Sequence, residues 1–389
     1  MHKSVASPKE RKLFLNDNNI NQQITHLKEE ITFLKHQYKQ LLQFIKEDRE
    51  TINQLKDKLE KTPSNQNQTT LPSQTLRKLS KHFQIKDIHS SQILALIELK
   101  DKRIVTGSKD GSICISKINY DKKDWNIQTQ VNNAHNDKIH SFCELIKKRF
   151  VSCGEDKLIK IWDYSTPSTL TNIHNIQGHT GGIVKVITLS EDRIASCSYN
   201  DDTVRIWESE FPFNLKQTFQ QQRYALSIIQ LKKRYEIICI SCTYGSGCLC
   251  FYDLVAPYQK RGTIEEVNTN LPGGLLELSN GDVAVSKGAY PVPCIYIVDP
   301  VRYVKVTEFV DEECIVDCGP LCSWGNNSFI YVVNNFLCVI SLVDEEYKIV
   351  FKEHKQKEQL NSVNSVVNVT KGKYLVNNNF TGLNILSYS

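Results

Sequence analysis

The chain has 389 residues, of which 40% are hydrophobic and 23% charged, which is ordinary for a globular protein. No apolar run approaches the ~20 residues of a membrane-spanning helix, and the N-terminus lacks the apolar core of a secretory signal, so we expect a cytoplasmic chain, with the nucleus as the alternative. Residues 1–90 hold 16 Lys and Arg against 10 Asp and Glu (net +6) and the remainder 32 against 33 (net −1), a balance too mild to predict a nucleic-acid partner.

Residues 1–19 are largely polar and are predicted to be disordered. From Ile20 to Leu59 apolar residues recur in alternating steps of 4 and 3, with Asp48 as the one polar exception. This 3.5-residue period predicts a left-handed coiled coil over 20–60, and mostly Ile at a with Leu at d favours a parallel homodimer. A more acidic partner helix, or a single amphipathic helix packed on the rest of the chain, are the alternatives. Residues 61–81 are predicted to be a polar linker.

From about residue 82 the chain repeats with a period of 43 to 46 residues. One position in every unit directly follows an apolar residue. We align the units by these equivalent positions and call the set the ruler column. Short alternating strands separated by Gly, Asn and Asp turns fill each unit. Seven such units, each with about four strands, predict an all-β seven-bladed β-propeller over 82–389. The ruler column consists of Ser116, Trp162, Trp207, Tyr252, Val298, Ser341 and Ser387.

The last unit offers three strands, predicted at 363–369, 373–378 and 382–387, rather than four. We expect the missing outer strand to be residues 82–88, which precede the first unit. Strands from both ends of the repeat region would then share the last blade and close the ring.

Two pairs of dipeptides carry a family resemblance: Ala134-His135 with Trp162-Asp163, and Gly178-His179 with Trp207-Glu208. Through them residues 82–389 resemble the WD-repeat (WD40) β-propellers. The resemblance implies a hydrogen-bonded tetrad of His, Ser or Thr, Asp and Trp inside a blade, and units four to seven lack it. The matching residues are His135, Ser152, Asp156 and Trp162 in the second unit, His179, Ser196, Asp201 and Trp207 in the third, and His89, Thr106 and Asp110 in the first, where Ser116 replaces the Trp.

No catalytic, metal or cofactor site is predicted, and we interpret the chain as non-enzymatic. The His–Asp pairs recur in three units, whereas an active site needs one copy, so we expect them to satisfy buried polar groups. Cys239 and Cys242 have a metal-like spacing, and Cys314, Cys318 and Cys322 are four residues apart. Without a suitably spaced second pair, these thiols are expected to pack in the core.

Two rims of the predicted propeller are candidate binding surfaces. The turns before the tetrad aspartates lie on the face that WD-repeat proteins commonly use for peptides, so the resemblance marks Lys109, Glu155, Asn200 and Tyr244 as partner-binding candidates. The turns between first and second strands form a basic rim that would receive an acidic protein segment or an anionic membrane, although solvated charges are the simpler interpretation. This rim contains Lys102, Arg103, Lys147, Lys148, Arg149, Lys232, Lys233 and Arg234.

These features predict a non-catalytic scaffold that binds other proteins or peptides through the propeller and dimerises through residues 20–60. Two propellers on one coil would gain affinity through effective concentration. The alternatives are a substrate-recognition subunit of a ubiquitin ligase and a signalling subunit that is similar to G-protein beta. The linker at 61–81 and the divergent later units argue against the last of these.

Overall fold

The structure is a computed structural model of the chain. It describes residues 79–222, 224–232, 234–243, 246–265, 274–287, 294–310, 318–323, 328–333, 336–343, 346–354, 366–369, 374–379 and 381–388. The predicted disordered N-terminus, the coiled coil at 20–60 and nearly all of the linker lie outside these residues, and the coiled coil therefore stays a prediction.

The described residues form seven four-stranded antiparallel sheets, which confirms the predicted all-β, seven-bladed architecture. In blades 1 to 6 the four strands pair in chain order from the inside outwards, and β26, β27, β28 and β1 form blade 7. One 3-10 turn, η1 (Ser190–Asp192), precedes β11. The strands of blades 1 to 3 are β2 (Ile93–Glu98), β3 (Ile104–Ser108), β4 (Ile113–Asn119), β5 (Asp124–Val131), β6 (Ile139–Leu145), β7 (Arg149–Gly154), β8 (Ile159–Asp163), β9 (Thr171–Ile176), β10 (Ile183–Leu189), β11 (Arg193–Ser198), β12 (Thr203–Glu208) and β13 (Leu215–Gln220). Those of blades 4 to 7 are β14 (Ala225–Gln230), β15 (Glu236–Thr243), β16 (Ser246–Asp253), β17 (Lys260–Ile264), β18 (Leu275–Glu277), β19 (Val283–Lys287), β20 (Cys294–Asp299), β21 (Val304–Val310), β22 (Cys318–Ser323), β23 (Ser328–Val333), β24 (Phe336–Val343), β25 (Glu346–His354), β26 (Val366–Val369), β27 (Tyr374–Asn379), β28 (Gly382–Tyr388) and β1 (Leu79–Ile85).

Burial along each strand follows from its distance to the axis. All five residues of β3 are buried, because a neighbouring blade covers each face of its sheet. In the outer strand β9 only Ile176 is fully buried. The chain therefore needs continuous apolar segments for inner strands and tolerates polar residues in outer ones.

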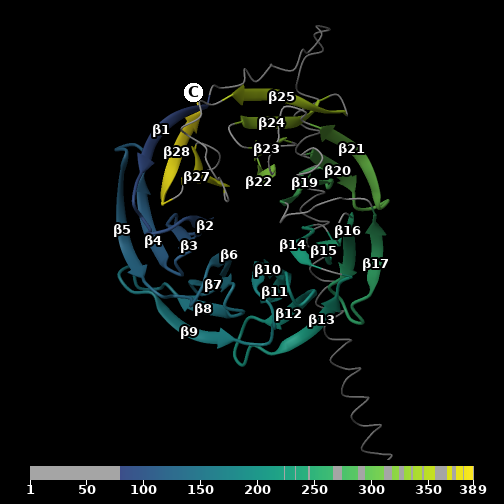
Figure 1. The fold of residues 1–389 in the computed structure, drawn as a ribbon, viewed down its shortest axis with the longest axis horizontal. Coiled ribbons are helices and arrows are strands. Elements are labelled where there is room, and N and C mark those ends of the chain that lie inside the picture. Colours follow the sequence, from purple (N-terminus) through teal and green to yellow (C-terminus); the bar gives the residue numbers. More distant parts are fainter. Residues whose placement is uncertain are drawn as a thin grey trace, which may run out of the picture. The chain divides into compact units, whose positions relative to one another are not determined.

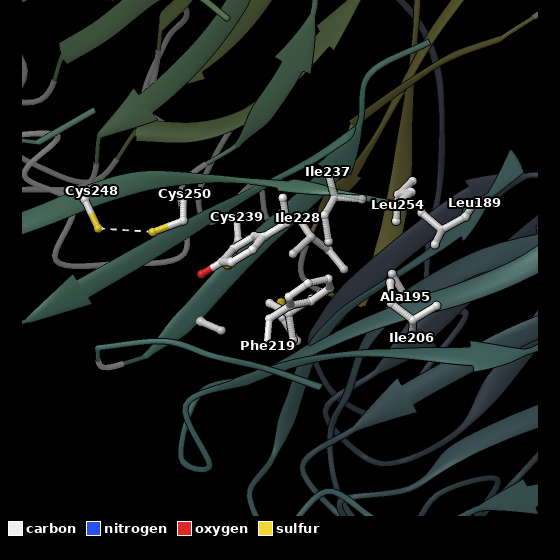
Figure 2. Packing of buried hydrophobic residues seen from close by; sticks show 14 residues of the cluster. Leu189, Ala195, Ile206, Phe219, Ile228, Ile237, Cys239, Cys248, Cys250 and Leu254 are labelled. Atoms are coloured by element: carbon white, nitrogen blue, oxygen red, sulfur yellow. Dashed lines mark hydrogen bonds between the residues drawn. The ribbon is translucent and has the colours of Figure 1, made fainter. Parts of the chain in front are cut away.

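The blades contact one another through their innermost strands, in the order β2, β6, β10, β14, β18, β22 and β26, and β26 returns to β2 (Figure 1). Side chains from adjacent blades interlock between the sheets. Figure 2 shows one such layer, in which Phe219 and Leu189 of blade 3 meet Ile228 and Cys239 of blade 4. The hydrophobic core is therefore a set of layers between blades.

The first described strand closes the ring, because β1 pairs with β28 at the outer edge of blade 7. It spans Leu79–Ile85, so the predicted position 82–88 is wrong by three residues. The backbone N–H groups of Ile88 and His89 donate to the carbonyl of Thr381 at 2.9 and 3.2 Å, which makes them part of the connection to β2. Gly382 lies so close to the Ile85 carbonyl that a Cβ there would have no room.

The ruler column occupies the third strand of every blade. In five blades the register to the outer strand shifts immediately before the column residue, as between Ile161 and Trp162 or between Phe251 and Tyr252. A β-bulge increases the local twist, and its repetition at the same place gives the blades a common shape even where the tetrad is missing.

Candidate functional site

The tetrad residues lie on one face of the propeller, which we call the top face. It is formed by the turns between second and third strands, such as 109–112, 155–158 and 199–202, and by the connections between blades, such as 132–138, 177–182 and 221–224. The opposite, bottom face is formed by the turns between first and second strands and between third and fourth strands.

Blades 2 and 3 form the complete tetrads that the resemblance implied. In blade 2, Trp162 Nε1 donates to Ser152 Oγ at 2.7 Å, Ser152 Oγ lies 2.6 Å from His135 Nε2, and His135 Nδ1 lies 2.9 Å from the Asp156 carboxylate. In blade 3 the same chain of contacts has lengths of 2.8, 2.7 and 2.7 Å and joins Trp207, Ser196, His179 and Asp201.

The partners favour one tautomer of these histidines. The Asp carboxylate can only accept, so the neutral ring carries its proton on Nδ1 and donates it to the Asp, and His Nε2 accepts from the Ser hydroxyl, whose oxygen accepts from the Trp N–H. Burial lowers the pKa of His135 and His179, although the Asp partner raises it. Burial raises the carboxyl pKa of Asp156, but the hydrogen bond and charge of His135 together with the backbone hydrogen bonds from Asn136 and Leu158 outweigh burial, and the net pKa is lowered.

Blade 1 departs from the predicted tetrad. His89 Nε2 lies 2.7 Å from Thr106 Oγ1, as expected, but Ser112 separates His89 from Asp110. The Ser112 hydroxyl donates to Asp110 at 2.5 Å and accepts from His89 Nδ1 at 2.6 Å. Burial lowers the pKa of His89 to about 4. Position 116 holds a buried serine, so no indole N–H reaches Thr106.

These networks leave no nucleophile–base pair that faces solvent. His135 and His179 are 1% and 6% exposed, and both ring nitrogens of each are engaged within the blade. The tetrads therefore stabilise their blades.

The four predicted partner-binding residues have different surroundings. Lys109 and Asn200 are exposed, and no ion pair engages the Lys109 amine within the described part of the chain. Glu155 accepts a hydrogen bond from His140 Nε2 at 3.0 Å and lies against Gly182 of blade 3, so it joins two blades. Tyr244 lies outside the described residues.

Sequence reasoning missed an aromatic pair on the same face. Tyr199 and Tyr224 stack with ring centroids 4.4 Å apart and an angle of 6° between the planes, and Tyr199 remains 39% exposed. The Tyr199 N–H donates to the Gly182 carbonyl at 3.1 Å and the Tyr224 N–H to Asp202 Oδ1 at 2.8 Å. The two tyrosines come from loops of blades 3 and 4, and only an exposed aromatic in a turn could have signalled the pair.

The predicted basic rim lies on the bottom face, where its arginines connect blades. An arginine at or just before the second strand of each of blades 1 to 4 reaches a residue of the next blade, and in three cases that residue is 61 positions further along the chain. These pairs are Arg103 with the Tyr164 carbonyl (2.8 Å), Arg149 with Glu210 (3.4 Å), Arg193 with the Leu254 carbonyl (3.1 Å) and Arg234 with the Pro300 carbonyl (3.2 Å).

Two of the five remaining rim cations are also engaged. Lys102 pairs with Glu98 at 3.3 Å and Lys147 with Glu210 at 2.9 Å. Lys148 and Lys232 are exposed without an ion pair among the described residues, and Lys233 lies outside them. These contacts neutralise part of the charge of the predicted basic rim, and its role in binding stays a prediction.

The cysteines behave as small hydrophobic residues. Ten cysteines are free and buried where the structure describes their side chains, Cys239, Cys242 and Cys322 among them. Burial raises the thiol pKa of Cys239. Within the described residues no group of three or more His, Cys, Asp or Glu could hold a metal ion. Cys314 lies outside the described residues.

Comparison with known proteins identifies the repeat. Residues 127–163 and 170–208, which contain all the residues of the two complete tetrads, match the family model described as WD domain, G-beta repeat. The crystal structure of the WD40 beta propeller domain of Doa1 superposes with a TM-score of 0.64 at 13% identity, over 80% of this chain and 97% of that chain. The fold is a WD40-repeat β-propeller. No curated protein matches the chain significantly.

At 13% identity the likeness to the Doa1 domain concerns the fold alone. The described part of the chain also contains no helix with the length and hydropathy needed to cross a bilayer.

Proposed function

We propose that this chain is a non-catalytic scaffold that binds a peptide segment of another protein on the top face, between blades 3 and 4, and dimerises through residues 20–60. The general use of WD40 propellers as protein-interaction scaffolds supports the first part. The internal use of the tetrad histidines and aspartates supports a role in binding rather than catalysis.

The stacked pair Tyr199–Tyr224 is the observation that carries the proposal. Tyrosine is enriched at protein interfaces because it offers a large apolar ring and a polar hydroxyl with few rotatable bonds. Here both backbones are held by hydrogen bonds of 3.1 and 2.8 Å. The pair is therefore ordered before a partner arrives, which reduces the entropy cost of binding.

The test compares proteins captured by the full chain with those captured by Tyr199→Ala. Because Tyr199 is 39% exposed on a turn, the variant should fold, and its melting temperature checks this. Val301→Ser is the matched control, since Val301 is 67% exposed on the bottom face. Partners of the top face should disappear with Tyr199→Ala and remain with Val301→Ser. Retention of every partner by both variants would contradict the proposed site.

The dimer is tested separately by light scattering of residues 15–62 at tens of micromolar. The seam of Ile and Leu predicts twice the monomer mass. A monomeric mass would remove the homodimer from the proposal but would leave the top-face site untouched. The ligase-receptor and G-protein-beta-like alternatives gain no support from any described residue.

A further inference from the structure

A groove of about 280 Å³ lies on the outer side of the propeller between blades 2 and 3. It runs from Gly178 on the top face, along β9 and β12, to Phe213 on the bottom face; Figure 1 shows β9 and β13 next to each other on the circumference. Gly178 has φ +150°, and a Cβ there would lie 2.8 Å from the Trp207 ring and 3.2 Å from Arg205 Nη1. The glycine therefore keeps the upper end open.

The lower part of the groove is apolar and partly exposed. The rings of Phe213 and His174 stack at 4.6 Å, and Trp207 and Leu215 complete the wall. Leu215 is 45% exposed, and Phe211, at the edge of the groove, is 79% exposed while its ring contacts those of His174 and Phe213. Two large apolar side chains thus remain in solvent beside an aromatic wall, which is typical of an interaction site rather than of a free surface.

The upper part of the groove carries one permanent cation and no acid. No Asp or Glu is present among the lining residues, and Arg205 supplies the cation. Its Nε donates to Thr203 Oγ1 at 3.1 Å, and the nearest carboxylate, Asp201, lies 3.9 Å from Nη2. Asp201 is already engaged by His179, Thr180 and Thr203. The Nη1 edge of Arg205 is therefore left with donors for a ligand.

Blade 2 provides an internal comparison. Lys160 occupies the position equivalent to Arg205, opposite the tetrad serine of its own blade. Its Nζ donates to the Ala134 carbonyl at 2.7 Å, and Ala134 corresponds to Gly178. The Lys160 amine of blade 2 is thus engaged by the backbone of its own blade, whereas the longer, forked guanidinium of Arg205 in blade 3 faces an open groove.

We infer that this groove binds an extended peptide segment of a partner protein in which a large apolar side chain lies next to a carboxylate. The carboxylate pairs with Arg205, whose planar donors match its two oxygens. The apolar side chain packs against Leu215 and Phe211, which are exposed beside the buried ring of Phe213. The absence of acids from the lining selects against basic segments. This site is separate from the Tyr199–Tyr224 pair and does not depend on the proposal made for Tyr199.

The experiment is a selection of phage-displayed random 12-residue peptides on the immobilised full chain. An enriched peptide is then synthesised and its binding measured by fluorescence anisotropy. We expect the enriched peptides to share an Asp or Glu within two residues of a Phe, Trp, Leu or Ile. Selection without enrichment, or a shared motif that lacks an acidic residue, overturns the inference.

Four variants of the full chain locate the binding. Arg205→Gln should weaken it by roughly 10- to 100-fold, the range for hydrogen bonds to a charged group. Because Arg205 also touches Thr203, two substitutions at half-exposed Leu215 give an answer even if that variant is unstable. Leu215→Glu should weaken binding roughly 10-fold or more, whereas Leu215→Lys should change it by less than about 3-fold. Val301→Ser, at a residue of the bottom face that is 67% exposed, should bind normally.

Three results would overturn the inference. Equal losses for Leu215→Glu and Leu215→Lys would show that charge plays no part. Unchanged binding by Arg205→Gln, or an equal loss with Val301→Ser, would place the peptide elsewhere. Self-association of the chain that is abolished by Leu215→Glu in mass photometry would show that a second copy occupies the groove.

Discussion

The arginines of the bottom face offer a direct test of what holds neighbouring blades together, and Arg103→Met is the most informative substitution. The Arg103 side chain in blade 1 is buried and its Nη2 donates to the Tyr164 carbonyl of blade 2 at 2.8 Å. Its guanidinium lies 5.0 Å from the centre of the Tyr164 ring and pairs with Asp101 at 2.8 Å. Methionine keeps most of the aliphatic stem and removes the charge and the donors.

The cost can be worked out contact by contact. A buried carbonyl that loses its donor costs about 1–3 kcal/mol, the cation–π contact contributes about 0.5–1 kcal/mol, and the half-exposed pair with Asp101 adds less than about 1 kcal/mol. Since these terms overlap, we expect a loss of roughly 2–4 kcal/mol, or roughly 3–6 °C in melting temperature for a propeller of this length.

Lys147→Met is the matched control, because Lys147 is a rim cation whose side chain is 59% exposed and pairs with a half-exposed Glu210. It should cost less than about 0.5 kcal/mol. Both variants are compared with the parent chain by urea unfolding and by thermal scans at one scan rate, followed by tryptophan fluorescence. Trp162 packs in the same cluster as Tyr164 and should report the event. Equal stability of the two variants would refute the view that Arg103 connects blades.

Three further predictions concern the tetrads and the ring closure. Trp207→Phe removes the N–H that reaches Ser196 at 2.8 Å and should cost roughly 1–3 kcal/mol in urea unfolding; an unchanged midpoint would mean that the indole bond is dispensable. Burial lowers the pKa of His89 from 6.5 to about 4, so as the pH falls the unfolded chain takes up this proton before the folded chain does. The free energy of unfolding should therefore decrease between pH 6.5 and 4, by up to about 3 kcal/mol for His89. Urea midpoints at pH 7 and 4.5 check this, and His89→Asn should show a shallower decrease. Deleting residues 79–85 removes the outer strand of blade 7 and should lower the melting temperature of the whole propeller, whereas an unchanged value would contradict ring closure by β1.

The repeat architecture was predictable because its signal is local and repeated. Each apolar residue before the ruler column, such as Ile161 or Ile206, marks the third strand of a blade. Seven copies at nearly constant spacing predict seven blades. The position of β1 was harder to predict from the sequence. Both 79–85 and 82–88 alternate in polarity, and the choice between them depends on the close contact between Gly382 and the Ile85 carbonyl, which lies 297 residues away in the chain.

The candidate sites were harder to predict because they depend on which repeats come together. The composition of the turns made Arg103 and Arg149 look like solvated charges, since nothing local reveals an acceptor 61 residues away. Ser112 could not be recognised as a bridge because the His–Asp spacing in blade 1 resembles that of the complete tetrads. Tyr199 and Tyr224 meet only after blades 3 and 4 are packed together.

The two proposed surfaces both border blade 3, and the reason is physical. A binding surface needs side chains held in place before the partner arrives, and blade 3 has a complete tetrad with the additional bond from Thr203 to Asp201 at 2.7 Å. Blade 2 is equally well held, but its cation Lys160 is bonded to the Ala134 carbonyl and its Glu155 to His140. Blades 2 and 3 therefore differ in which side-chain donors the fold leaves unused, and we propose that this difference makes blade 3 the binding repeat. By this criterion the Nη1 edge of Arg205 is the part of blade 3 where we propose that a partner binds.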